Sequence, residues 1–435
     1  MPVTHHQPGT RLVVDNEPAP YPEAVVAVQG SKNCFNHMAV VGLLGDQNHS
    51  VTLTNTPDIA DRATVSRILR SVGLSVELDA DRLAIAGQLR DGVLDPSDMR
   101  RLRVSICYGA AAAAVCGHCW IPLPGGDAFT TRPIDLHLGV LAAAGAQVHV
   151  LEDGIDVTFD RRPHGFRLDV SGPFGPSMGA SVTALAVASV ARGSSILRGM
   201  SIEPEVEQVK QALRTAGVTI RDADPSICVV EGADGPLSGS VTGEVPPDRM
   251  EAASYIFLAT AKKTPLRLDG LRPVDLPSGL RRVLAASRVG VTAIGHDSTR
   301  VDGTDLHPVD LETEPHPGYP TDAQPQLASL LAFADGVSSV RESIYPRRTS
   351  HVEELAKLGV RIDVDGTRQI IPGSQRAHNG TADVKDIRCG AALLIAASTV
   401  PGRTELNDAS QHLRRGYSDL IRKLGALGMS AAWVA

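Results

Sequence analysis

The chain has 435 residues, a formal net charge of −7, 43% hydrophobic residues and 21% charged residues. This length predicts two or three domains, and the composition is ordinary for a globular protein. Aromatic residues make up only 3% of the chain, which together with the acidic balance argues against a broad nucleic-acid-binding surface. A small anion site made of a few arginines is compatible with these values.

Hydropathy and cysteine usage predict a cytoplasmic protein without a membrane span. No charge-free apolar run reaches the roughly 18–20 residues that a transmembrane helix needs, and the N-terminal residues lack the plan of a signal peptide. Six cysteines are scattered along the chain, at positions 34, 107, 116, 119, 228 and 389. Such spacing is typical of reduced thiols.

A short pattern recurs along the chain: a helical Leu/Ala stretch, a glycine, and the start of a strand. The copies lie at 69–76, 141–148, 213–220, 284–293, 355–362 and 421–430, and their glycines are Gly73, Gly145, Gly217, Gly290, Gly359 and Gly428. Each glycine is predicted to cap a helix in the left-handed conformation. Commonplace helix–glycine–strand joints are the alternative, but the near-constant period favours six copies of one unit.

Strand-like runs and apolar helices complete the unit. Five copies have a strand-like run and a polar turn before the capped helix, at 50–61, 194–206, 264–276, 337–348 and 402–411, whereas the second copy has 119–133 there. Alanine-rich stretches that are apolar nearly all round follow, at 109–115, 181–191, 251–261, 326–334 and 389–398. Such stretches predict helices buried inside a domain.

Two segments indicate where the chain passes between domains: Gly30-Ser31, and 244–250 with its Pro-Pro pair. We therefore predict an α/β protein of two inside-out α/β domains, each made of three βαβαββ-type units with buried helices and with a cleft between the domains. The first domain spans 32–246. The second combines 1–31 with 247–435, and the double crossing lies near 30–32 and 245–248.

Six motifs in register carry a family resemblance. They are SKN (31–33), LPGGDAFTTRPIDLH (123–137), PDR (247–249), YPTDAQ (319–324), DIR (386–388) and RRGY (414–417). Together the chain resembles the UDP-N-acetylglucosamine enolpyruvyltransferase family, relatives of enolpyruvylshikimate-phosphate synthase. Members of this family fold as two inside-out domains of three units each, so the resemblance implies the architecture that the repeats predict independently.

The resemblance implies transfer of an enolpyruvyl group from phosphoenolpyruvate to a hydroxyl, with release of phosphate and with no metal or cofactor. Arginines match both anionic groups of phosphoenolpyruvate in bidentate geometry. The implied binding residues are Lys32, Arg103, Arg132, Arg348, Arg388 and Arg415. By family match, Lys32, Arg132 and Arg415 hold the phosphate, and Arg348 and Arg388 hold the carboxylate. Any one of these arginines could instead be a solvated surface charge.

Two acidic residues match catalytic positions. Asp127, in the loop 123–137, stands where many family members have a cysteine that fosfomycin alkylates, so the resemblance implies a fosfomycin-resistant enzyme. It is the candidate proton donor to phosphoenolpyruvate, and a turn residue after Gly-Gly is the alternative. Asp322 matches the carboxylate near the attacking hydroxyl, as general base or as orienting group. A helix N-cap is its alternative role. Lys32 and Arg415 complete the candidate catalytic set.

Further motif positions imply a uridine nucleotide as the acceptor. Uracil would stack over Arg132 and Pro133, with backbone groups near Asp135 and Leu136 reading its edge, and Ser177 and Gly179 belong to a nucleotide-phosphate loop. Asn33 and Asp322 complete the implied nucleotide set. The pair Cys116 and Cys119 forms a C-x-x-C motif, but it joins a helix to a strand and has no second copy, which disfavours a redox or zinc role.

Several positions depart from the family pattern, namely 33–38, Ile202, Tyr345, Pro346, Arg347 and Arg414. The two additional arginines would suit an acceptor with a terminal dianionic phosphate. We therefore expect transfer to the 3′-hydroxyl of UMP, the reaction of related enzymes in nucleoside-antibiotic biosynthesis. The alternatives are the UDP-N-acetylglucosamine reaction of peptidoglycan synthesis and a non-catalytic nucleotide-binding homologue. The sequence leaves the oligomeric state open.

Overall fold

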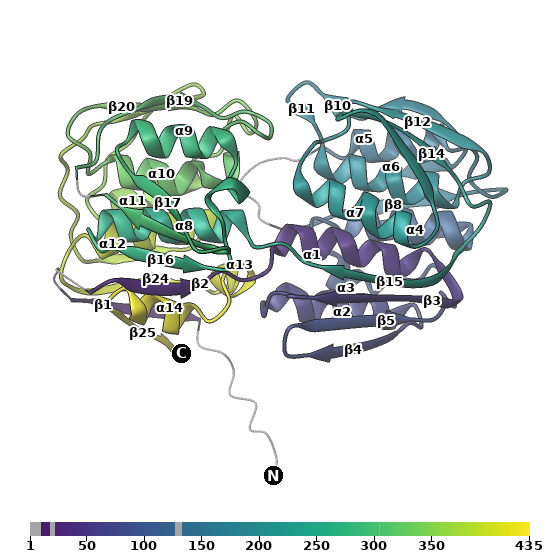
Figure 1. Ribbon diagram of the computed structural model, residues 1–435, viewed down its shortest axis with the longest axis horizontal. Coiled ribbons are helices and arrows are strands. Elements are labelled where there is room, and N and C mark those ends of the chain that lie inside the picture. The colour runs from purple at the N-terminus through teal and green to yellow at the C-terminus, as the bar shows by residue number, and fades with distance from the viewer. Residues whose placement is uncertain (1–9, 18–21, 127–132, 304) are drawn as a thin grey trace, which may run out of the picture. The chain divides into compact units, whose positions relative to one another are not determined.

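A computed structural model describes residues 10–17, 22–126, 133–303 and 305–435 (Figure 1). Internal contacts divide these residues into two units. The first unit comprises 30–126 and 133–246, and the second unit comprises 10–17, 22–29, 247–303 and 305–435. Each unit has its own hydrophobic core. No helix in the described part of the chain is both long enough and apolar enough to cross a membrane.

The first unit places its strands in three sheets and a hairpin, with the orders β15-β3-β5-β4, β6-β8-β7, β13-β14-β12-β9 and β10-β11. Its strands are β3 (Gly45–Thr54), β4 (Ser75–Asp79), β5 (Arg82–Ala86), β6 (His118–Pro122), β7 (Gln147–Val150), β8 (Gly154–Thr158), β9 (Arg167–Asp169), β10 (Ser171–Gly172), β11 (Gly175–Pro176), β12 (Ser194–Arg198), β13 (Thr219–Asp224), β14 (Ile227–Glu231) and β15 (Leu237–Glu244). Its helices are α1 (Lys32–Met38), η1 (Ala39–Leu43), α2 (Ala60–Ser71), α3 (Pro96–Met99), α4 (Ser105–Cys116), α5 (Asp135–Ala143), α6 (Met178–Val190) and α7 (Pro204–Thr215).

The second unit places its strands in three four-stranded sheets, with the orders β17-β18-β16-β2, β19-β20-β22-β21 and β23-β24-β1-β25. Its strands are β1 (Arg11–Asn16), β2 (Ala24–Ala27), β16 (Leu266–Asp269), β17 (Gly290–Ile294), β18 (Ser298–Asp302), β19 (Asp310–Glu312), β20 (Ser338–Arg341), β21 (Asp363–Asp365), β22 (Arg368–Ile371), β23 (Thr381–Asp383), β24 (Gly402–Asn407) and β25 (Met429–Val434). Its helices are α8 (Arg249–Ala261), η2 (Pro273–Asp275), α9 (Ser278–Ala286), η3 (Thr321–Ala323), α10 (Gln324–Leu331), α11 (Ser350–Ala356), α12 (Ile387–Ser398), α13 (His412–Gly416) and α14 (Leu420–Ala426).

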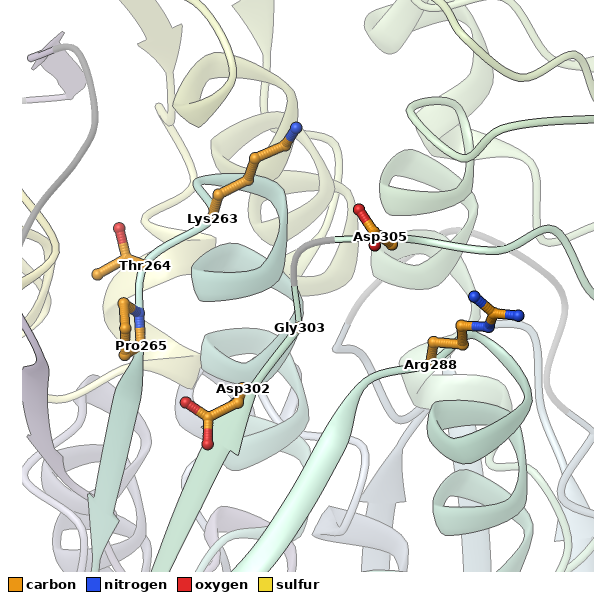
Figure 2. A pocket seen from close by; sticks show the side chains of 7 residues that line it. All are labelled: Lys263, Thr264, Pro265, Arg288, Asp302, Gly303 and Asp305. Carbon is orange, nitrogen blue, oxygen red and sulfur yellow. The ribbon is translucent and has the colours of Figure 1, made fainter.

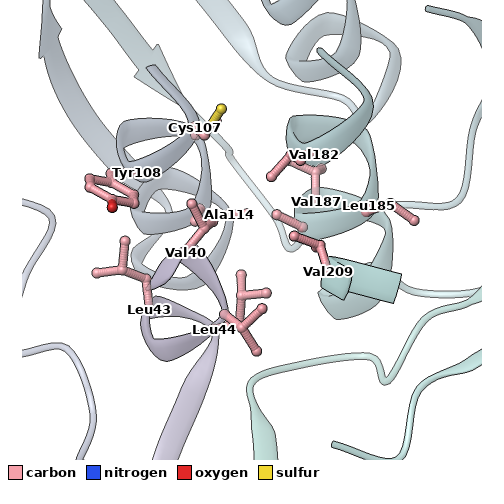
Figure 3. Close-up of a cluster of buried hydrophobic side chains, with 14 of the residues drawn as sticks. Val40, Leu43, Leu44, Cys107, Tyr108, Ala114, Val182, Leu185, Val187 and Val209 are labelled. Carbon is pink, nitrogen blue, oxygen red and sulfur yellow. The ribbon is translucent and has the colours of Figure 1, made fainter. Parts of the chain in front are cut away.

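Both units bury helices and place sheets outside them, which confirms the predicted inside-out α/β fold. All described residues of α10 and α12 are buried, as are 105–114 of α4 and 180–190 of α6. Because these helices are apolar on every side, each can be surrounded by protein. Figure 3 shows the core of the first unit, where side chains of η1, α4, α6 and α7 meet between helices.

Five of the six predicted glycine caps occur at positive φ, between 70° and 100°. The prediction for Gly290 is wrong, because this residue begins β17. Arg288 takes the left-handed position after α9 instead, with a φ of 61°. The alignment of the six repeats favoured Gly290, because a residue with a Cβ rarely adopts the left-handed conformation. With Arg288 as the cap, the six positions are separated by 72, 72, 71, 71 and 69 residues.

The two crossing segments of the chain run beside each other. The Ser31 N–H donates to the Pro246 carbonyl at 2.7 Å, and the Asp248 N–H donates to the Gln29 carbonyl at 2.8 Å. Asp248 also begins α8, because its carboxylate accepts from the Met250 and Glu251 N–H groups. Crossing and helix start therefore share one local hydrogen-bonded arrangement.

Candidate active site

Three of the predicted site residues converge in the second unit. Asp322 lies in η3, Arg348 lies just before α11, and Arg388 lies in the first turn of α12. Arg348 Nη1 donates to Asp322 Oδ1 at 2.9 Å, and Arg388 Nη2 donates to Asp322 Oδ2 at 3.0 Å. The fold thus joins one carboxylate to two guanidinium groups that are 26 and 66 positions away in the sequence.

The charge state of Asp322 follows from these contacts. Burial alone would raise the pKa of its carboxyl group, but Arg388 and Arg348 hold that pKa well below its usual range. Burial opposes the charged form of both arginines, yet Asp322 raises the pKa of each. A carboxylate held so firmly in its charged form is a good hydrogen-bond acceptor and a weak base. The geometry therefore favours the orienting role of Asp322 over the role of general base.

Exposure separates the three residues. The side chain of Arg348 is 1% exposed and that of Arg388 is 8% exposed, whereas that of Asp322 is 31% exposed. Only Asp322 presents a substantial surface to a substrate. Arg348 is placed to hold Asp322, and little of its guanidinium is accessible to a bound ligand.

A buried glutamate that sequence reasoning missed organises this site. Glu342 follows β20 and is 1% exposed. Its Oε1 accepts from Thr313 Oγ1 and from the N–H groups of Ile344 and Tyr345, each at 2.9 Å. Its Oε2 accepts from Thr321 Oγ1 at 2.9 Å. Glu342 thus ties the loop that leads to Arg348 to the residue before Asp322. No motif marks it, since it is an isolated acid after a strand.

The start of α12 fixes the backbone of Arg388. Asp386 is fully buried and accepts from the N–H groups of Arg388 and Cys389, at 2.8 and 3.0 Å. Ser350 Oγ donates to the same carboxylate and ties α11 to α12. The motif DIR (386–388) is therefore a capped helix start that presents an arginine.

Arg415 lies in α13 and is half-buried. Asp408 fixes the beginning of this helix, because its carboxylate accepts from the N–H groups of His412 and Leu413, at 2.7 and 2.9 Å. The neighbouring Arg414 departs from our expectation that it adds a cation for a substrate phosphate. Its guanidinium stacks 4.2 Å from the ring centroid of Trp433 in β25. This cation–π contact ties α13 to the outer sheet and explains Arg414 structurally.

In the first unit, Lys32 opens α1 and lies beside an acid that sequence reasoning missed. Lys32 Nζ is 3.3 Å from Asp61 Oδ2, and Asp61 is in the first turn of α2 with a 3% exposed side chain. Ser31 caps α1 by accepting from the Cys34 N–H, and the Asn33 carbonyl lies 2.7 Å from His37 Nδ1. The predicted residues Lys32 and Asn33 are therefore fixed at a helix start.

Five of the predicted nucleotide residues lie at the starts of α5 and α6, namely Pro133, Asp135, Leu136, Ser177 and Gly179, whereas Asn33 lies in α1 and Asp322 in η3. Arg103 Nη2 donates to the Pro133 carbonyl at 2.8 Å, just before Asp135 and Leu136 open α5. Ser177 caps α6 by accepting from the Ala180 N–H at 3.2 Å.

A histidine joins these two helices. His137 Nδ1 of α5 lies 2.8 Å from Thr183 Oγ1 of α6, and a Cβ on Gly179 would lie 3.0 Å from the ring. Burial, together with a smaller effect of the Arg103 charge, lowers the pKa of His137 to about 3. The histidine is therefore neutral, and it holds the two helix starts together. Any side chain at 179 would require the ring to shift by a few tenths of an ångström.

Two of the predicted site residues, Asp127 and Arg132, lie outside the described residues. The C-x-x-C motif has the predicted order, since Cys116 ends α4 and Cys119 lies in β6. In the described ranges, no three His, Cys, Asp or Glu side chains cluster as metal ligands.

A surface hollow of 370 Å³ lies elsewhere in the second unit, lined by Lys263, Thr264, Pro265, Arg288, Asp302, Gly303 and Asp305. Its charged side chains do not point toward a common centre (Figure 2), and it includes none of the predicted site residues. It is therefore separate from the candidate active site.

Comparison with known proteins identifies relatives over nearly the whole length. Residues 19–424 match the family model of EPSP synthase (3-phosphoshikimate 1-carboxyvinyltransferase). The UDP-N-acetylglucosamine 1-carboxyvinyltransferase of Hyphomonas neptunium is 33% identical over 93% of this chain and 94% of its own. The corresponding protein of Dinoroseobacter shibae is 35% identical with the same coverage.

Solved structures share the fold. The enolpyruvyl transferase NikO from Streptomyces tendae superposes with a TM-score of 0.87 at 26% identity and covers 98% of this chain and 99% of its own. An EPSP synthase from Acinetobacter baumannii has a TM-score of 0.70 at 16% identity over 97% of this chain and 100% of its own. The second likeness concerns the fold alone.

Proposed function

The chain belongs to the EPSP synthase family and is an enolpyruvyl transferase, and we propose that its acceptor is a uridine nucleotide, UMP, at the 3′-hydroxyl. Phosphoenolpyruvate is the second substrate, and the proposed reaction uses no metal or organic cofactor. The methylene carbon of phosphoenolpyruvate gains a proton while the acceptor oxygen bonds to C2, and the proton that the acceptor hydroxyl gives up ends on the released phosphate. The tetrahedral adduct then loses a proton from that methyl group and expels phosphate, which leaves an enol ether.

Each role falls to a residue whose chemistry suits it. Lys32, Arg132 and Arg415 hold the phosphate, and Arg388 faces the carboxylate of phosphoenolpyruvate. The partly exposed carboxylate of Asp322 accepts a hydrogen bond from the attacking hydroxyl and orients it. Asp127 supplies the proton to the methylene carbon and takes it back during elimination. The positive charges of Lys32 and of these arginines stabilise the charges of the adduct and of the leaving phosphate.

The observation that carries the choice of UMP is the guanidinium of Arg347. This side chain is exposed and makes no hydrogen bond or ion pair with any residue that the structure describes, and it directly precedes the buried Arg348. An exposed cation next in the chain to Arg348, which pairs with Asp322, suits an acceptor with a terminal dianionic phosphate, which UMP has and a diphosphate diester lacks. Because Arg414 stacks on Trp433, the argument rests on Arg347 alone.

The second candidate acceptor is UDP-N-acetylglucosamine. It is favoured by relatives of 33–35% identity that bear the name of that activity. A non-catalytic homologue is disfavoured, because the ion-paired Asp322, the capped Arg388 and the Lys32–Asp61 pair are all in place.

The acceptor assay is the test of the proposed function. We expect phosphate release from phosphoenolpyruvate with UMP and little with UDP-N-acetylglucosamine. Arg347→Ala should raise the KM for UMP by about 10- to 100-fold, since a charge-assisted contact to phosphate contributes about 1.5–3 kcal/mol, and should leave kcat nearly unchanged. Arg341→Ala, an exposed arginine at the end of β20, is the matched control. Turnover with UDP-N-acetylglucosamine alone would assign the chain to the second candidate reaction.

Fosfomycin tests the role of Asp127. A carboxylate attacks the epoxide far more slowly than a thiolate does, so the wild-type enzyme should keep its full activity after incubation with the drug. Asp127→Cys should be inactivated in a time-dependent manner, with a mass increase equal to one drug molecule. Cys116→Ser is the control, because Cys116 is the exposed native thiol. Inactivation of the wild-type enzyme that Cys116→Ser does not prevent would contradict the role given to Asp127.

A further inference from the structure

We propose that Gln29 is a positioning residue for the transfer reaction, because it fixes the segment that carries Arg415. This inference rests on the role of Arg415 in the proposed function. Gln29 is the last residue of the second unit before the chain crosses to the first. Its side chain is buried, with 8% of the residue exposed. No family motif includes it.

The carboxamide of Gln29 binds the backbone of the residues that follow Arg415. Its Nε2 donates to the Gly416 carbonyl at 3.0 Å, and its Oε1 accepts from the Ser418 N–H at 2.8 Å. These are backbone groups of the first and third residues after Arg415. One carboxamide supplies both the donor and the acceptor, which a carboxylate cannot do in its charged form. The chain after Arg415 is therefore held at two points by one side chain.

Gln29 is itself anchored by buried charges. Its N–H donates to Glu251 Oε2 at 2.8 Å, and Lys423 Nζ lies 2.7 Å from Glu251 Oε1. Lys423 Nζ also donates to Ser418 Oγ at 3.3 Å, which closes a ring of contacts through Gln29, Glu251, Lys423 and Ser418. Both charged side chains are almost fully buried, at 0% and 3% exposure. A closed, buried ring of this kind leaves its members little freedom.

The same segment packs against the start of α12. A Cβ on Gly416 would lie 2.4 Å from Ile387 Cγ2, so the backbone after Arg415 touches the residue before Arg388. Tyr417 Oη lies 2.8 Å from Ser254 Oγ of α8, which adds a third anchor. A shift of this segment would therefore move Arg415 relative to Arg388. Errors of about 1 Å in such positions cost about 100-fold in rate.

The test compares variants of the chain 1–435, assayed with whichever of UMP and UDP-N-acetylglucosamine the wild-type chain turns over. Gln29→Met keeps the length of the side chain and removes both hydrogen bonds, and we expect kcat to fall by about 10- to 100-fold. The KM for the nucleotide should stay within about 2-fold, because the side chain of Gln29 contacts Gly416 and Ser418 and none of the residues to which a nucleotide role is given. Gln29→Glu keeps the acceptor for Ser418 and loses the donor to Gly416, so it should fall between wild type and Gln29→Met. It also provides the test if Gln29→Met does not fold.

A double-mutant cycle decides whether Gln29 acts through Arg415. Gln29→Met should add nothing to the kcat defect of Arg415→Ala, since there is then no guanidinium to position. Defects that multiply, or wild-type kcat in Gln29→Met, would overturn the inference. Wild-type kcat in Arg415→Ala would instead overturn the role of Arg415 in the proposed function. Hydrogen exchange of the peptide covering 412–418, which needs no turnover, should rise in Gln29→Met, and unchanged exchange there would also overturn the inference.

Discussion

Replacing Asp322 with asparagine is expected to lower kcat by about 100-fold, the cost of a misplaced reacting group. The substitution keeps the shape of the side chain but removes the charge that Arg348 and Arg388 share. One of the two oxygens becomes an NH₂ group, which must face a guanidinium donor or turn away from it. The hydroxyl of the acceptor then loses its orienting carboxylate. Steady-state phosphate release at saturating substrates measures the effect.

The same substitution should reduce stability with a defined pH dependence. Arg348 and Arg388 lose their shared counter-ion while buried, which costs up to about 3–5 kcal/mol in fully buried pairs and less here because Asp322 is partly exposed. The folded pKa of Asp322 lies below its unfolded value of about 3.9, so the stabilisation is present above that value and is lost as the pH falls through the folded pKa. The gap between wild type and variant should stay constant from about pH 5 to 9 and narrow below about pH 4.

Asp363→Asn is the matched control, because Asp363 forms an exposed ion pair with Arg361 at 2.9 Å. Exposed pairs contribute about 0–1 kcal/mol, so this variant should keep its kcat and nearly all of its stability. A kcat of Asp322→Asn within about 3-fold of wild type would show that the carboxylate does not take part in the reaction. Asp322 of the wild-type enzyme stays ionised over the pH range in which activity is measured. If activity falls at low pH in the wild-type enzyme and also in a partly active Asp322→Asn variant, this fall therefore reports the protonation of another group.

The sequence predicted the architecture well because the repeat is a property of local chemistry. Helices that are apolar on every side must be buried, and left-handed caps favour glycine, so both leave a periodic trace. The exception at Arg288 shows the limit of that trace. Nothing in the sequence distinguishes an arginine in the left-handed conformation from other surface arginines. The cap was therefore predicted at the nearby Gly290, two positions after Arg288.

The residues of the candidate site also divide into those that the sequence predicted and those that it did not. Asp322 and Arg388 lie in the motifs at 319–324 and 386–388, so the sequence marked both as site residues, and the structure brings them into contact. Glu342 and Asp61 could not be predicted, because a buried acid is defined by partners distant in sequence and leaves no local pattern. The contact of Arg414 with Trp433, 19 positions later in β25, was also not predicted, because the position next to a motif suggested a ligand contact instead. Pairings across sheets are the information that one sequence does not carry.

Replacing Lys423 with methionine is expected to lower the free energy of unfolding by about 3–5 kcal/mol at pH 8. The side chain of Lys423 is 3% exposed, and its partner Glu251 is fully buried. Removing one partner leaves the other charge without compensation in a medium that solvates it poorly. Arg422→Ala on the same helix is the control, because its pair with Asp419 is exposed and should contribute at most about 1 kcal/mol. Chemical denaturation of both variants measures the difference.

The pH dependence of this loss separates a charge effect from a packing effect. Burial raises the pKa of Glu251 to about 7, although Lys423 lowers it, so without Lys423 the pKa lies higher still. A carboxyl group whose folded pKa exceeds its unfolded value of about 4.3 binds a proton on folding, and stability then falls as the pH rises through the folded value. The deficit of Lys423→Met should therefore be largest at pH 8 and shrink toward pH 5. Adding Glu251→Met should restore part of the stability at pH 8, because no buried charge is then left unpaired. A deficit that is the same at both pH values, with no recovery in the double variant, would mean that Lys423 stabilises the fold by packing alone.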